Sequence, residues 1–206
     1  MDSLLIILSG LTAASVHVFS GPDHLASLTP IAVEVKKKAW YVGFLWGIGN
    51  LSGMLLLATI FLLFKTLLPI NKISEISEQL VGVVLCAVGI SAVYKAFKNK
   101  KPLNDNRVNQ NQVLLSLSIG LIHGLAGFSH FILLLPVLSF ESWSQGVQYV
   151  IGFSVGTVVS MILYAGILGL LVNTKRNVLT FIKVIRIVGG VIAFLVGVYW
   201  LQSTVF

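Results

Sequence analysis

Long apolar stretches alternate with short polar segments along the whole chain, and this pattern predicts membrane-spanning helices. The apolar stretches are residues 4–33, 40–64, 80–97, 113–138, 147–172 and 181–201. Each is close to or longer than the ~20 residues that an α-helix needs to cross the hydrocarbon core of a bilayer. We therefore predict an all-α integral membrane protein with six transmembrane helices.

Two of the predicted spans contain residues that weaken a helix. Gly21 and Pro22 lie inside the first span, where proline removes a backbone hydrogen bond and pushes against the preceding turn. The fourth span carries Gly124 and Gly127. Backbone groups freed by a break are tolerated in a membrane only where protein or a water-filled cavity satisfies them. We expect helices 1 and 4 to be kinked or broken, and helix 1 to face the inside of the bundle.

The second half of the chain repeats features of the first half. Four residues recur at an offset of 106 positions: His17, Gly21, His24 and Pro30 match His123, Gly127, His130 and Pro136. Glycines also recur in the following spans: Gly43 and Gly47 match Gly152 and Gly156, and Gly82 and Gly89 match Gly190 and Gly197.

A repeat of three spans has an odd number of crossings, so its second copy must enter the membrane from the opposite side. The sequence thus predicts one transmembrane domain built as an inverted 3+3 repeat, a construction typical of transporters. The first repeat covers residues 1–97, a polar linker covers 98–112, and the second repeat covers 113–206.

Basic residues are concentrated on one side of the predicted membrane. Of the 14 Lys and Arg residues, all except Lys65 and Lys72 lie in or beside the segments that follow spans 1, 3 and 5. The positive-inside rule places those segments in the cytoplasm. We expect a multi-pass protein of the cell (inner) membrane with both termini extracytoplasmic. The net charge of +7 then reflects topology, and lipid rather than nucleic acid is the expected surrounding.

The histidines are the strongest candidates for chemistry. All four lie in the two interrupted spans, at His17, His24, His123 and His130, and Asp23 is an acidic residue inside an apolar span. Ionisable residues inside a membrane are costly and point to function. Imidazole is a common ligand of transition metals, and a carboxylate adds negative charge. We predict that these five residues form a shared metal or proton site.

Two arrangements of this site are open from the sequence. On a straight helix His17 and His24 would lie ~10 Å apart along the axis, too far for one metal ion. Either the break at Gly21 brings them together, or they form two successive stations along a path. Alternative roles are hydrogen bonding between helices for each histidine, and capping of the helix after the break for Asp23.

Other residues add weaker signals. Asn50, Ser129, Ser154 and Thr157 are polar positions inside spans and candidates for a transport path, although packing is the alternative role of each. Glu34, near the end of the first span, is expected at the membrane interface. Glycine-rich helix faces would permit a homodimer. The chain has no phosphate-binding loop and no further cluster of acids and bases, so an enzyme is not expected.

Two stretches resemble the motifs of a known family. Residues 16–26 read Val-His-Val-Phe-Ser-Gly-Pro-Asp-His-Leu-Ala, and residues 120–127 read Gly-Leu-Ile-His-Gly-Leu-Ala-Gly. They are similar to the two motifs of the UreH-like transmembrane family, within the nickel/cobalt permease superfamily. The likeness covers essentially the whole chain. It implies a permease in which His17, Asp23 and His24 bind the transition metal, with nickel or cobalt as the first candidates.

The function predicted from the sequence is transport of a divalent transition metal through a His and Asp site in mid-membrane. The metal would be the transported substrate, not a fixed cofactor. One alternative is a membrane accessory protein that delivers metal to an enzyme. Another is a proton-coupled carrier of an anion or small organic substrate, with the histidines as a proton relay.

Overall fold

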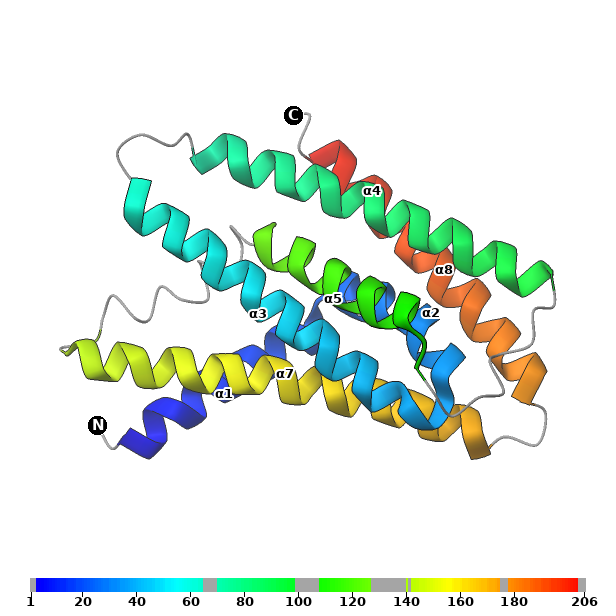
Figure 1. Ribbon diagram of the computed structural model, residues 1–206, viewed down its shortest axis with the longest axis horizontal. Coiled ribbons are helices and arrows are strands. Elements are labelled where there is room, and N and C mark those ends of the chain that lie inside the picture. The colour runs from blue at the N-terminus through cyan, green and yellow to red at the C-terminus, as the bar shows by residue number, and fades with distance from the viewer. Residues whose placement is uncertain are drawn as a thin grey trace.

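The computed structural model describes residues 3–64, 70–98, 108–126, 140, 142–174 and 178–203, and its regular elements there are all helices (Figure 1). The elements are α1 (Ser3–Ser20), α2 (Pro22–Val35), the 3-10 turn η1 (Lys36–Lys38), α3 (Ala39–Phe64), α4 (Ile70–Phe97), α5 (Gln110–Leu125), α7 (Trp143–Thr174) and α8 (Val178–Ser203). The predicted all-α class is confirmed.

Within this described part, five segments are long and apolar enough to cross a membrane. They are Ser3–Ser20, Pro22–Leu57, Gln79–Phe97, Trp143–Val172 and Leu179–Gln202. The predicted fourth span, 113–138, is described only as far as Ala126. Most of the predicted linker lies outside the described residues, as do Gly127, Ser129, His130 and Pro136.

The structure divides the first predicted span at the Gly21-Pro22 pair, where a kink or break was expected, and starts the third span earlier than predicted. The stretch 4–33 forms two helices, α1 and α2, separated by Gly21 in an extended conformation with φ −84° and ψ 103°. Helix α4 begins at Ile70, ten residues before the predicted start of the third span. Residues 70–79 are rich in charged and polar types. Hydropathy alone therefore does not predict that they belong to the same helix as the apolar span that follows.

The helices pack in close pairs that depend on glycine. Helix α1 packs along α7 and α3 packs along α5, while α4 lies against α8 (Figure 1). At the α3–α5 contact, a Cβ atom on Gly124 would collide with the backbone carbonyl oxygen of Asn50, and one on Gly120 would collide with that of Trp46. Such close approach is what small residues permit in membrane helix pairs.

Helix α2 is the short central element of the bundle. All of its residues except Pro22, Leu25 and Glu34 are buried. On one side it joins a core cluster that includes Leu28, Trp46 and residues of α1, α5 and α7. On the other side its Ala26 packs with residues of α4 and α8. The polar side chains of α2 are therefore enclosed by the bundle.

Candidate functional site

The break at Gly21 places three candidate side chains beside one another. His17 lies in the last turn of α1, while Asp23 and His24 lie in the first turn of α2. The Gly21 N–H donates to the His17 carbonyl oxygen at 2.9 Å. Pro22 is the first residue of α2, a position at which a backbone N–H would have no hydrogen-bond partner within the helix. The Gly21 N–H thus closes the last turn of α1, and Pro22 has no N–H to lose, so one helix can end and the next begin here.

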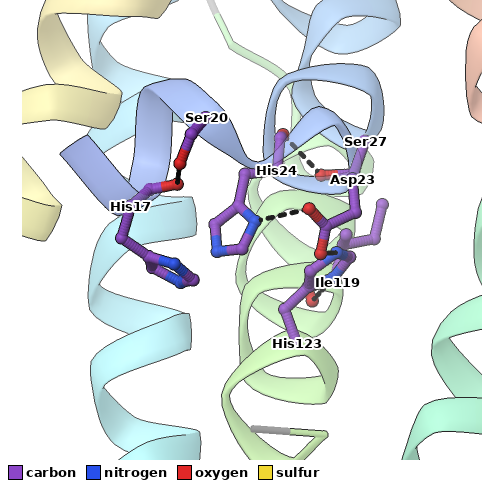
Figure 2. A network of polar contacts seen from close by, with 7 residues as sticks. All are labelled: His17, Ser20, Asp23, His24, Ser27, Ile119 and His123. Atoms are coloured by element: carbon purple, nitrogen blue, oxygen red, sulfur yellow. Dashed lines mark hydrogen bonds and ion pairs between the residues drawn. The ribbon is translucent and has the colours of Figure 1, made fainter. Parts of the chain in front are cut away.

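Asp23 is the centre of a buried polar cluster (Figure 2). Its Oδ1 lies 2.9 Å from His24 Nδ1, and its Oδ2 lies 3.9 Å from His123 Nε2 on α5. Asp23 is 8% exposed, and His24 and His123 are each 2% exposed. One carboxylate therefore stands between imidazoles that come from the two halves of the chain.

The three described imidazoles form a row. The ring centroids of His17 and His24 lie 4.8 Å apart in an edge-on arrangement, and those of His24 and His123 lie 5.6 Å apart. His123 is oriented by its own helix, since its Nδ1 lies 3.2 Å from the Ile119 carbonyl oxygen. Of the two arrangements open from the sequence, the structure has the one in which the break brings His17 and His24 together.

The cluster leaves no room for a side chain at position 21, which explains why this residue is glycine. A Cβ atom at this position would lie 2.8 Å from His24 Nδ1 and 2.9 Å from Asp23 Oδ1. Real Cβ atoms do not approach other atoms so closely, so any side chain would displace one of the two groups. The φ of Gly21 is −84°, which other residues also adopt. The requirement therefore comes from the site and not from the backbone conformation.

Trp46 of α3 belongs to the site but was not predicted from the sequence. Its ring centroid lies 5.4 Å from that of His24 and 5.3 Å from that of His123, and its side chain is fully buried. Tryptophan in membrane proteins is enriched at the two interfaces. Its place within an apolar span was the signal that could have indicated a special role.

Within the part of the chain that the structure describes, the arrangement is a row of side chains and not a closed metal cage. Among the described residues, no three His, Cys, Asp or Glu side chains are close enough together to hold one metal ion. The cluster offers a carboxylate charge with imidazole nitrogens on both sides, in surroundings with little solvent. Such groups can bind a divalent cation stepwise or pass a proton from one ring to the next.

The remaining candidates are placed as follows. Asn50 is buried on α3, where its backbone contacts Gly124 beside His123 and its Nδ2 lies 3.7 Å from Met54 Sδ. Ser129 and His130 fall outside the described residues. The capping role considered for Asp23 is wrong, because the N-cap residue of α2 is Gly21 and no side chain caps it.

Ser154 and Thr157 bond within their own helix. The Ser154 hydroxyl donates to the Val150 carbonyl oxygen at 2.8 Å, and the Thr157 hydroxyl donates to the Phe153 carbonyl oxygen at 3.0 Å. Both bonds span one turn of α7. Thr157 is linked to the cluster indirectly through Phe153, whose ring centroid lies 6.4 Å from that of His17.

These features define a class: an all-helical, multi-pass membrane protein with a histidine–aspartate cluster inside the bundle. The chain is distantly homologous over its full length to the urease accessory protein UreH of Bacillus sp. (strain TB-90). The two are 26% identical over 216 residues, which cover 98% of this chain and 93% of UreH.

Two plant proteins are also similar. They are the chloroplast proteins FOR GROWTH AND FERTILITY 2 and 1 of Arabidopsis thaliana, which are 30% identical to the chain over 172 and 178 residues. Each match covers 78% of this chain but only 46% and 48% of the plant proteins, so the chain spans about half of their length. No family model and no solved structure matches the chain.

Proposed function

We propose that the protein is a membrane permease for a divalent transition metal, with nickel or cobalt as the first candidates. The observation that carries the proposal is the meeting of His17, His24 and His123 around Asp23. Segments about 100 residues apart bring these groups together inside an otherwise apolar bundle. His130 is proposed as a further ligand from the second half.

The chemistry of the cluster suits a cation that is passed on. The Asp23 carboxylate supplies the negative charge that attracts it, and neutral imidazoles replace its hydration waters one at a time. Conduction needs sites that bind well enough to admit an ion but weakly enough to release it. A row of ligands meets that need better than a closed cage, which would trap the metal.

An inverted repeat is part of the proposal and is supported by glycine pairing. Gly82 on α4 lies against Gly197 on α8, and Gly89 lies against Gly190. When the two halves of the sequence are aligned, Gly82 corresponds to Gly190 and Gly89 corresponds to Gly197. Gly82 therefore contacts the equivalent of Gly89, and Gly89 contacts the equivalent of Gly82. Such exchanged contacts are expected across a two-fold axis.

The side of the membrane also belongs to the proposal. Counting Lys and Arg on alternate sides favours cytoplasmic segments after spans 1, 3 and 5. Both termini would then lie outside the cytoplasm, with the protein in the inner membrane. Short tags accessible to impermeant reagents at either terminus would test this orientation.

The experiment that tests the function is metal accumulation in cells that lack their own nickel uptake. Cells expressing the wild type are expected to accumulate nickel or cobalt, in a screen that also includes zinc, manganese and iron. His24→Ala should return accumulation to background. Ser160→Ala is the control, because it removes a buried hydroxyl that bonds to Ser15 outside the cluster. Lowered accumulation would indicate export, and an unchanged level for every metal would contradict the proposal.

A second candidate is a membrane accessory protein that delivers metal to an enzyme without sustained transport. The name of its full-length relative, a urease accessory protein, favours it. Uptake of radioactive nickel into vesicles that contain only the purified protein separates the two functions. A carrier that uses the histidines as a proton relay would instead show proton movement in such vesicles with no added metal.

A further inference from the structure

The histidine cluster has little contact with solvent, although metal transport and proton transfer both require exchange with water. Asp23 is 8% exposed, and His24 and His123 are each 2% exposed. Either function therefore needs a route that runs between two of the helices. Such a route is marked by polar groups that are buried without a partner, because each costs free energy unless water can reach it.

Three of the helix pairs approach each other too closely to enclose this route. The α3–α5 contact is closed by glycines, as described above. In the α1–α7 pair, a Cβ atom on Gly152 would collide with the backbone carbonyl oxygen of Ile7. In the α4–α8 pair, one on Gly89 would collide with that of Gly190. No glycine of α2 or α5 makes such a contact between those two helices.

The surface between α2 and α5, here called the α2–α5 seam, leads from the cluster to the start of α5. At one end Asp23 Oδ2 lies 3.9 Å from His123 Nε2. At the other end Glu34 of α2 and Gln112 of α5 line the same cavity. On each helix the two residues are 11 positions apart, or ~16 Å. The helices are thus antiparallel, and the seam ends where Asn111, in the first turn of α5, is exposed.

One face of α5 carries polar side chains along the seam. Gln112, Ser116 and His123 are spaced by four and seven residues, which places them on one side of a helix. Ser116 is fully buried, and its hydroxyl has no hydrogen-bond partner among the described residues. It does not make the bond to its own helix that Ser154 makes. Gln112 Nε2 is likewise buried without a partner in the described part of the chain.

Helix α2 adds polar groups to its own side of the seam. Ser27 is fully buried one turn after Asp23, and its hydroxyl donates to the His24 carbonyl oxygen at 2.8 Å. Pro30 has no N–H group to donate to the Ala26 carbonyl oxygen, so this backbone acceptor lacks its usual helical donor. Both helices therefore offer hydrogen-bonding groups to water within the bundle.

An apolar side chain closes the seam in this structure. Ile119 lies between Ser116 and His123 on the same face of α5 and is 2% exposed. It belongs to a core cluster with Leu28 and Ile31 of α2. Apolar constrictions of this kind gate a path by excluding water.

We propose that the α2–α5 seam is the aqueous access path of the histidine cluster, with Ser116 as a hydrated position along it and Ile119 as its gate. The inference deepens the proposed function and rests on it, since an ion or a proton has to reach the cluster. In the proposed orientation the start of α5 follows the cytoplasmic linker. The path therefore opens toward the cytoplasm.

Cysteine accessibility tests the path without relying on transport. Cys86 is the one cysteine of the chain, so Cys86→Ala gives a background without thiols. In this background Ser116→Cys places a thiol of similar shape on the path. Ser160→Cys is the matched control, because Ser160 is 2% exposed and its hydroxyl bonds to Ser15 in the tight α1–α7 pair. The measurement is the rate at which aminoethyl methanethiosulfonate, a small water-soluble cation, modifies each full-length protein in lipid vesicles, followed by mass spectrometry.

Ser116→Cys should react about tenfold faster than Ser160→Cys or more, because thiol modification depends on access to water. Adding Ile119→Ala should raise the rate at position 116 further and leave position 160 unchanged. Equal rates at the two positions would overturn the path, and no effect of Ile119→Ala would overturn the gate.

Nickel or cobalt should slow the modification of Ser116→Cys, since the ion would occupy the path. Metal accumulation by the wild type is measured separately. Fast reaction at position 116 with neither protection nor accumulation would contradict the metal function and retain the path. Accumulation together with equal rates at positions 116 and 160 would contradict the path alone.

Discussion

The two ends of α2 hold ionisable groups inside the same bundle in opposite ways. Asp23, at one end, has His24 and His123 as its described ionisable partners. Glu34, at the other end, has Lys95 and Arg186. Imidazoles can be neutral and then act as metal ligands, whereas arginine keeps its charge. The first carboxylate is therefore available to an incoming cation, while the second is already neutralised.

This difference shows that a buried carboxylate is not by itself a sign of a cation site. The partners decide what each end can bind. The imidazoles around Asp23 can give up protons and bind a metal ion in their place. With two permanent cations around it, Glu34 joins α2 to α4 and α8. The two ends of one helix therefore hold their carboxylates in different ionic surroundings.

The largest expected effect is that of Asp23→Asn. This change keeps the shape of the side chain but removes the charge that attracts the cation, so nickel or cobalt accumulation should fall to the level of cells without the protein. Accumulation per folded molecule, with folded protein measured by size-exclusion chromatography, is the readout. Glu34→Gln is the same change at the other end and should retain most of the accumulation. Equal losses from the two substitutions would end the distinction between the sites.

The next largest effect is expected for Gly21→Ala. The added methyl group must displace His24 or Asp23, because it would lie within 3 Å of both side chains. Metal accumulation should fall about tenfold, equivalent to about 1.4 kcal/mol. Gly166→Ala is the matched control, since the nearest atom to its Cβ is 3.7 Å away and alanine is the better helix former. Full accumulation by Gly21→Ala would show that the contact between His24 and Asp23 is not needed.

The smallest effect on transport, and the largest on stability, is expected for Glu34→Gln. Removing the shared carboxylate leaves Arg186 buried beside Lys95, and breaking a buried pair in this way costs roughly 3 kcal/mol. The Tm should fall by about 6 °C or more. Asp23→Asn, measured in parallel, should change the Tm by less than about 2 °C, because its imidazole partners can remain neutral.

Hydropathy was sufficient to predict much of the fold. The apolar runs correctly predicted helices over 40–64, 147–172 and 181–201, each within a few residues of α3, α7 and α8. It did not predict the early start of α4, because that part of the helix has a polar composition. The division of the first span at Gly21 followed from a glycine and a proline in sequence.

The sequence by itself determined which residue types could carry chemistry in an apolar chain. His17, Asp23, His24 and His123 were found because ionisable groups are rare within such spans. Only the tertiary structure decided which groups meet. It placed Trp46 against two imidazoles, paired Glu34 with Lys95 and Arg186, and left Ser154 and Thr157 bonded within α7. These outcomes depend on which helix faces pack together, and that is fixed by contacts between segments far apart in the chain.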